Sequence, residues 1–129
     1  MFGDKAELDS MGCVQFVNEN NQAYNAALRS VVSDLRSLFP DADMDIFDYY
    51  AANVEILKNP TAYEFNPDKT MTACCGVEGA GRYNYDYHHH CGMHTASMCA
   101  NPDEHVNWDG VHFTEQFYRT IPRFVLDGK

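Results

Sequence analysis

The sequence contains 129 residues and carries a formal net charge of −10. That length is enough for one modest hydrophobic core, and 45% hydrophobic with 13% aromatic residues is a globular rather than a disordered composition. A strongly negative surface repels phosphate backbones, which argues against nucleic-acid binding. No apolar run approaches the roughly 20 residues that a bilayer span requires, so no membrane span is predicted.

The cysteine content indicates an oxidising compartment. Four of the five cysteines lie between positions 74 and 99, in a segment with too few apolar residues to hold a shape without cross-links. An odd number leaves at least one cysteine outside any internal pairing. The N-terminal string MFGDKAELDSMG has neither the basic nor the apolar region of a signal peptide, so none is predicted in this chain.

The first expected element is one long helix from about Phe16 to Leu38, ended by Pro40. The apolar residues in its second half recur at the spacing of a single helical stripe: Leu28, Val31, Val32, Leu35, Leu38 and Phe39. Polar and charged side chains occupy the other faces. These residues need only pack, so a scaffold role is predicted.

The next segment, DADMDIFDYY at 41–50, predicts a short strand with Met44, Ile46 and Phe47 as its apolar part. A second short helix is expected at about 51–57, ending before an Asn-Pro pair. Helix, strand and helix in this order indicate an α/β fold.

Residues 60–108 are expected to form one long loop with a short strand near 62–65, an arrangement that indicates function or cross-linking. After Trp108 the apolar spacing becomes helical again. Pro122 lies inside that pattern and removes a backbone hydrogen bond, so a kink or an early end is expected. The aromatic residues of this region either line a substrate cleft or pack in the core, and packing is favoured. They are Trp108, Phe113, Phe117, Tyr118 and Phe124. The same two alternatives apply to Asp48, Tyr49 and Tyr50, and packing is again favoured.

The candidate chemistry lies in VNWDGVHFTEQFYR, residues 106–119. Asp109 precedes His112 by three residues at a junction between loop and helix. In hydrolases a carboxylate orients a histidine that takes a proton from a nucleophile, and this spacing brings both side chains to one side of the backbone. The same four residues also suit an ordinary turn, because Asp-Gly is a common turn dipeptide.

The clustered cysteines are predicted to form disulfides rather than a metal site. Zinc sites favour two to four residues between cysteine ligands, whereas Cys74 and Cys75 are adjacent. Disulfides among Cys74, Cys75, Cys91 and Cys99 allow three connectivities, and Cys13 is left over. The run His88–His90 is interpreted as an exposed loop feature with adventitious metal affinity. No cofactor and no metal ligand are predicted.

Several motifs in one order resemble the plant GDSL esterase/lipase family. NWDGVHFTEQFYR resembles the family's C-terminal block. ELDSMGC at 7–13, the helix that ends in LRSLFPDADMDIFDYY, and TACCGVEGAGRYNYD at 72–86 with its later cysteines resemble the segments that precede that block. The resemblance covers nearly the whole chain, which implies that residues 1–129 are the C-terminal portion of a single hydrolase domain.

The resemblance implies a fold and two site residues. The fold is a partial three-layer α/β/α sandwich, flavodoxin-like and of the GDSL/SGNH type, with a long disulfide-rich loop. Asp109 orients His112, and His112 is the general base of ester hydrolysis. The nucleophilic serine and the oxyanion-hole residues belong to blocks that precede this segment. The string at 2–4, Phe-Gly-Asp, is followed by Lys5 where the serine is required, and Ser10 belongs to the ELDSMGC string.

The expected function is therefore that of a fragment of a carboxylic ester hydrolase, inactive alone because loss of the nucleophile removes about 10⁶-fold in kcat. The substrate of the complete enzyme is a small-molecule or lipid ester, its location is extracellular by family resemblance, and the partner of this chain is a complementing N-terminal segment. The alternative is a disulfide-stapled remnant or binding module without activity. Pro122 mildly favours the remnant, because the family's terminal helix usually continues through that position.

Overall fold

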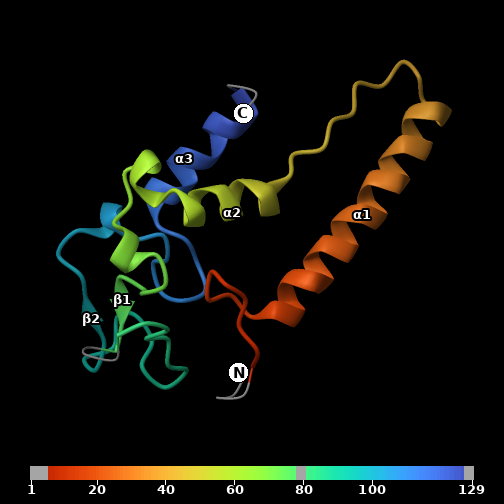
Figure 1. Ribbon diagram of the computed structural model, residues 1–129. Helices are drawn as coiled ribbons and strands as arrows, with labels where there is room; N and C mark the ends of the chain where they lie inside the picture. The colour runs from red at the N-terminus through yellow and green to blue at the C-terminus, as the bar shows by residue number, and fades with distance from the viewer. Residues whose placement is uncertain (1–5, 78–80, 127–129) are drawn as a thin grey trace. The chain divides into compact units, whose positions relative to one another are not determined.

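A computed structural model of the protein describes residues 6–77 and 81–126, and Figure 1 shows their elements in chain order. The α-helices are α1 (Gln15–Leu38), α2 (Tyr49–Lys58) and α3 (Glu115–Leu126). Short 3-10 helices and strands connect them: η1 (Pro60–Tyr63), η2 (Pro67–Lys69), β1 (Cys75–Gly76), β2 (Ser97–Met98) and η3 (Pro102–Glu104). The chain divides into two units, Met1–Asn53 and Val54–Lys129, with the boundary inside α2.

Helix α1 of the first unit confirms the predicted long helix. It ends where expected, because the N–H of Phe39 still donates to the carbonyl of Leu35 at 2.8 Å and Pro40 follows. None of its residues is buried, and Val31 and Leu38 are 53% and 70% exposed. An amphipathic helix obtains most of its stability from burying its apolar face; in α1 the stripe residues Val32 and Leu35 are half-buried and the other stripe residues are exposed.

The carboxylate of Asp9 shapes the turn before α1. One oxygen accepts the backbone N–H groups of Met11 and Cys13, both at 2.9 Å, and the other accepts the amide of Asn18 at 2.8 Å. Burial alone would raise the pKa of Asp9, but these hydrogen bonds outweigh it and the pKa lies below the usual value. An ionised carboxylate therefore ties the turn to the helix.

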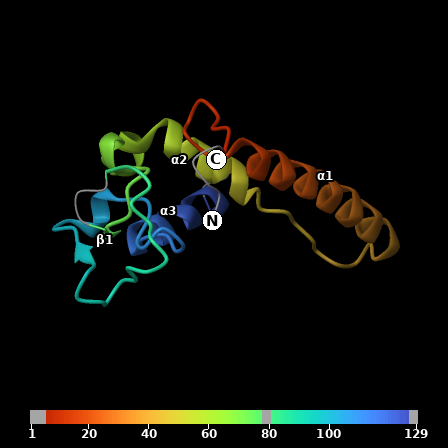
Figure 2. The same ribbon diagram turned by 90° about the horizontal axis from the view of Figure 1, so that it is seen from below.

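The predicted strand at 41–50 is wrong. Figures 1 and 2 show an extended connection between α1 and α2, and within the described residues no neighbouring strand pairs with it. Arg36 donates to the carbonyl of Met44 at 2.6 and 2.9 Å, and Arg29 pairs with Asp48 at 2.8 Å. The helix predicted for 51–57 is confirmed as α2.

The second unit contains a small antiparallel sheet. Cys75 of β1 lies opposite Met98 of β2, and Gly76 lies opposite Ser97. The strand expected near 62–65 is instead the 3-10 helix η1, which Pro60 begins. In residues 6–77 and 81–126 this two-stranded sheet is the whole of the β-structure in named strands, so the three-layer sandwich remains a prediction for a complete domain.

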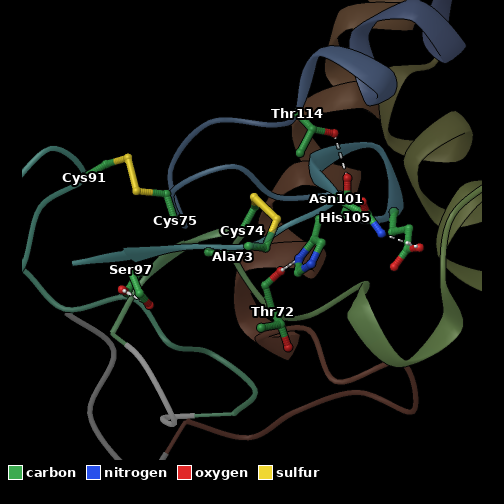
Figure 3. The surroundings of a disulfide bond; sticks show 12 residues. Thr72, Ala73, Cys74, Cys75, Cys91, Ser97, Asn101, His105 and Thr114 are labelled. Atoms are coloured by element: carbon green, nitrogen blue, oxygen red, sulfur yellow. Dashed lines mark hydrogen bonds between the residues drawn. A yellow bond between two sulfur atoms is a disulfide. The ribbon is translucent and has the colours of Figure 1, made fainter.

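Two disulfides hold this sheet and its loops, which confirms the cross-linking interpretation. Cys74 bonds to Cys99 and Cys75 bonds to Cys91. Figure 3 shows the two bonds beside each other, with Cys91 on a separate loop. Cys13 lies outside both bonds. Cys74 and Cys75 are buried, so the adjacent pair ties the chain at Cys91 and at Cys99 to the start of β1.

Aromatic side chains build the core of the second unit. The rings of Phe113 and Phe117 stack at 4.0 Å between centroids, and Phe65 approaches Phe117 at 6.5 Å. Phe117 is fully buried, so its role is packing. Helix α3 lies against η3, and it continues through Pro122 to Leu126. Of the two outcomes expected at Pro122, a kink or an early end, the early end is therefore wrong, and the length of the helix gives no support to the remnant interpretation.

Thr114 and His105 join the start of α3 to the disulfide region. The hydroxyl of Thr114 donates to the carbonyl of His105 at 2.7 Å and accepts the N–H of Phe117 at 3.3 Å, as an N-cap residue does. His105 is buried, and its Nδ1 lies 2.9 Å from the carbonyl oxygen of Thr72 (Figure 3). This histidine is a packing residue.

Replacing Thr114 with alanine removes a helix cap and leaves a buried carbonyl with one partner fewer. We expect Thr114→Ala to lower the free energy of unfolding by about 1–2 kcal/mol. The control is Thr61→Ala in the exposed turn η1, which should stay within about 0.5 kcal/mol of the parent. Urea denaturation followed by circular dichroism measures both, and equal losses for the two variants would contradict the cap.

Candidate active site

The turn that carries Asp109 and His112 is anchored to the disulfide-bonded strand. Asn107 and Phe113 pair as an isolated antiparallel bridge on either side of the turn. The N–H of Trp108 donates to the carbonyl of His112 at 2.9 Å, and the N–H of Cys75 donates to the carbonyl of Trp108 at 2.6 Å. Backbone hydrogen bonds therefore fix both ends of the turn and join it to β1.

Within the turn, both oxygens of the Asp109 carboxylate act as acceptors. One accepts the backbone N–H groups of Val111 at 2.9 Å and His112 at 2.7 Å. The other lies 2.8 Å from Nδ1 of the His112 ring. Gly110 has a φ of +84°, a conformation that residues with a side chain rarely adopt. The sequence Asp-Gly-x-His thus builds a turn in which the first residue holds the last.

This geometry determines the state of the imidazole. Burial alone would raise the pKa of Asp109, but the hydrogen bonds from His112 and Val111 outweigh it and lower the pKa below its usual value. An ionised carboxylate only accepts hydrogen bonds, so Nδ1 of His112 carries the proton and donates it. The lone pair of Nε2 is then available as a base, on a side chain that is 69% exposed.

Both side chains line a pocket of about 240 Å³. Its other walls come from β1, from the loop before Cys91 and from Val111: Cys75, Gly76, Tyr85, Asp86, His89, His90, Cys91 and Val111. Among the described residues, the lining contains no serine, no threonine and no reduced cysteine, since Cys75 and Cys91 are bonded to each other. The described pocket therefore offers a base without a conventional nucleophile.

A second aspartate–histidine pair in the same pocket was not predicted from the sequence. Asp86 accepts the backbone N–H of His88 at 2.7 Å on one oxygen, and Nδ1 of His89 lies 3.1 Å from the other. The hydrogen bond from His88 is the main cause of a lowered pKa of Asp86, and His89 lowers it further. His88 and His90 are exposed, as the interpretation of an exposed run expects, and His89 between them is partly buried. The available signal was the spacing, because Asp86 precedes His89 as Asp109 precedes His112.

Asn84 and Gly76 hold the loop of this second pair against β1. The buried amide of Asn84 accepts the N–H of Ala73 at 2.7 Å and donates to the carbonyl of Ala73 at 3.0 Å. A Cβ at Gly76 would lie 2.6 Å from the Asn84 amide nitrogen. The two backbones can approach this closely because position 76 has no side chain.

The other predicted residues serve the structure or lie outside it. Asp48 pairs with Arg29, and the hydroxyl of Tyr50 accepts the amide of Gln22 at 3.1 Å, all within the first unit. Across residues 6–77 and 81–126, no three acidic, histidine or cysteine side chains are arranged to hold a metal ion. The string at 2–5 lies outside the described residues.

Gly110 should be essential to the site. A Cβ there would lie 2.7 Å from Cβ of Tyr85, in addition to the strain of the positive φ. We expect Gly110→Ala to destabilise the fold by at least about 1 kcal/mol and to shift the NMR signals of His112. Gly92→Ala is the matched control, since Gly92 has a φ of +92° and nothing lies within 4 Å of the position that its added methyl group would take. Equal shifts at His112 in both variants would contradict the predicted clash.

The contribution of Asp109 to the free energy of unfolding should depend on pH. Its pKa is lowered in the folded chain, so its contribution is present above the unfolded value of about 3.9 and is lost as pH falls through the folded pKa. We expect Asp109→Asn to be less stable than the parent at pH 7, and the difference to shrink toward pH 2–3. Thermal unfolding of both proteins across pH tests this, and a difference that grows with acid would contradict it.

Comparison with known proteins shows what the chain is similar to. The family model described as GDSL-like lipase/acylhydrolase matches residues 3–123. A GDSL esterase/lipase of Arabidopsis thaliana is 37% identical over 93% of this chain and 30% of its own length. Acetylajmalan esterase 1 of Rauvolfia serpentina is 34% identical over 96% and 31%, and sinapine esterase of Brassica napus is 32% identical over 91% and 29%. The chain thus spans about 30% of these relatives' length. No solved structure matches it.

Proposed function

Because the chain belongs to the GDSL-like lipase/acylhydrolase family, we propose that it is the C-terminal portion of a carboxylic ester hydrolase domain. In this proposal Asp109 and His112 are two members of a Ser-His-Asp triad. The observation that carries it is the 2.8 Å contact between the Asp109 carboxylate and Nδ1 of His112, in a chain of a lipase and acylhydrolase family.

The reaction follows from the protonation state of the ring. Nε2 of His112 accepts the proton of the serine hydroxyl as the serine oxygen attacks the ester carbonyl. The imidazolium that forms is stabilised by Asp109 and then donates its proton to the departing alcohol. In the second half, His112 takes a proton from water as the water oxygen attacks the acyl-serine carbonyl. His112 then gives that proton to the serine oxygen as the carboxylic acid leaves, which restores the serine hydroxyl and the neutral imidazole.

The serine and the oxyanion-hole donors belong to a segment that complements this one. The sequence has no G-D-S block, and the described residues that line the pocket beside His112 include no such nucleophile. We expect the 129-residue chain to be inactive alone and a complementing N-terminal segment to be its partner. The complete domain would have the three-layer α/β/α arrangement, in which the exposed apolar stripe of α1 is covered.

The proposal includes a substrate class, which the names of the relatives support, and a location, which the disulfides support. Two of them are named for the esters acetylajmalan and sinapine, so a small-molecule or lipid ester is the proposed substrate. Two disulfides support an extracellular location, because such bonds persist in oxidising compartments. In the described part of the chain, no helix has the length and apolarity to cross a membrane.

The competing proposal is a disulfide-stapled remnant or binding module without catalysis. It requires His112 to be enclosed in a core without a cleft. His112 is instead 69% exposed and lines the pocket, which favours the hydrolase.

The test is reconstitution with the N-terminal, serine-bearing part of a similar plant GDSL esterase, assayed with p-nitrophenyl acetate. We expect turnover only when both parts are present. His112→Ala should abolish it, and Asp109→Asn should reduce kcat by about 10⁴-fold. His94→Ala is the control, because His94 does not line the pocket. Hydrolysis by the 129-residue chain alone that vanishes in His112→Ala would contradict the proposal.

A further inference from the structure

Two aspartate–histidine pairs with the same three-residue spacing line one pocket. In each, an aspartate accepts the backbone N–H two residues later, and its second oxygen meets Nδ1 of the histidine three residues later. The proposed hydrolase uses one pair, Asp109 and His112. The other pair, Asp86 and His89, lies in the segment before Cys91, and Cys91 is bonded to Cys75 of β1.

The tautomer of His89 follows from its surroundings. Its Nδ1 is buried, and among the described residues it has no aligned hydrogen-bond partner. It lies 3.1 Å from an oxygen of the Asp86 carboxylate, close enough for an ion-pair contact. The lowered pKa of Asp86 keeps that carboxylate ionised at neutral pH. A nitrogen that faces a carboxylate carries a proton, so Nε2 of the neutral ring is left as a hydrogen-bond acceptor.

From this arrangement we propose that His89 is a specificity-determining residue, which accepts a hydrogen bond from a hydroxyl group of the ester substrate. Asp86 is the positioning residue that presents Nε2 of His89. The inference rests on the proposed hydrolase function, since it places the ester beside His112 in the same pocket. The substrate class is a hydroxyl-bearing ester, phenolic or polyol.

The remaining walls suit the hydrocarbon part of such a molecule. The Tyr85 ring, the Val111 side chain and the disulfide of Cys75 and Cys91 line the pocket beside the two histidines. These groups offer apolar contact, while a hydroxyl that enters without an acceptor would lose its hydrogen bond to water. A hydrogen-bond acceptor on His89 removes the desolvation cost of a substrate's hydroxyl group. It does not improve the binding of a substrate that has no hydroxyl group.

The test uses the 129-residue chain and needs no turnover. Phenol and anisole are matched probes, because the methyl ether has the same ring but no donor. Binding is followed at pH 8 through the ¹⁵N signals of the histidine rings. We expect phenol to shift Nε2 of His89, and anisole to leave that signal unchanged.

The variants separate recognition from general structure. Asp86→Asn keeps an oxygen for the backbone N–H of His88 but turns a donor toward Nδ1 of His89, so Nε2 becomes protonated and stops accepting. We expect phenol binding to weaken by about 3–10-fold, with unchanged signals from the core ring of Phe117 as the check on folding. His89→Gln should weaken it similarly, and His94→Gln should not.

The outcome for His112 distinguishes this inference from the proposed function. In His112→Ala the phenol shift at His89 should persist, whatever the result of the hydrolysis assay. Equal shifts with phenol and anisole, or no shift at His89 with phenol, would overturn the proposal. A phenol response that survives in Asp86→Asn would overturn the positioning role.

Discussion

The carboxylate of Asp109 is the interaction on which the site depends. It accepts two backbone N–H groups and lies against Nδ1 of His112, all within 2.9 Å. The same group therefore shapes the turn, aligns the ring and selects its tautomer. The backbone of Cys75 holds this turn, and Cys75 and Cys91, which are bonded to each other, also line the pocket. The local sequence aligns the carboxylate of Asp109 with the ring of His112, and the cross-linked strand β1 holds this pair in the pocket.

Part of the site could be predicted because it is local. Asp109 and His112 are three residues apart, and one turn suffices to bring them together. The same local rule operates at Asp86 and His89, and that pair was not predicted because a run of three histidines obscured the spacing. The shared pocket could not be predicted, since it requires two loops far apart in the chain to meet at β1. The disulfide pairing was also non-local, and the sequence left three connectivities open.

The fold shows the same division. Helices α1 and α2 follow from apolar spacing and a proline, and both were predicted. The strand expected around Ile46 was wrong because a strand exists only with a partner, and none in the described residues pairs with it. Helix α3 passes through Pro122, although the proline removes a hydrogen bond. The burial of Phe117 and Ile121 and the Thr114 cap stabilise the part of the helix that precedes Pro122.

The most direct measurement of the central claim is the tautomer of the His112 ring in the intact chain. A long-range ¹H–¹⁵N NMR spectrum at pH 8 distinguishes the two ring nitrogens. We expect a proton on Nδ1, donated to Asp109, and a bare Nε2. A ring protonated on Nε2, or one that samples both forms equally, would contradict it.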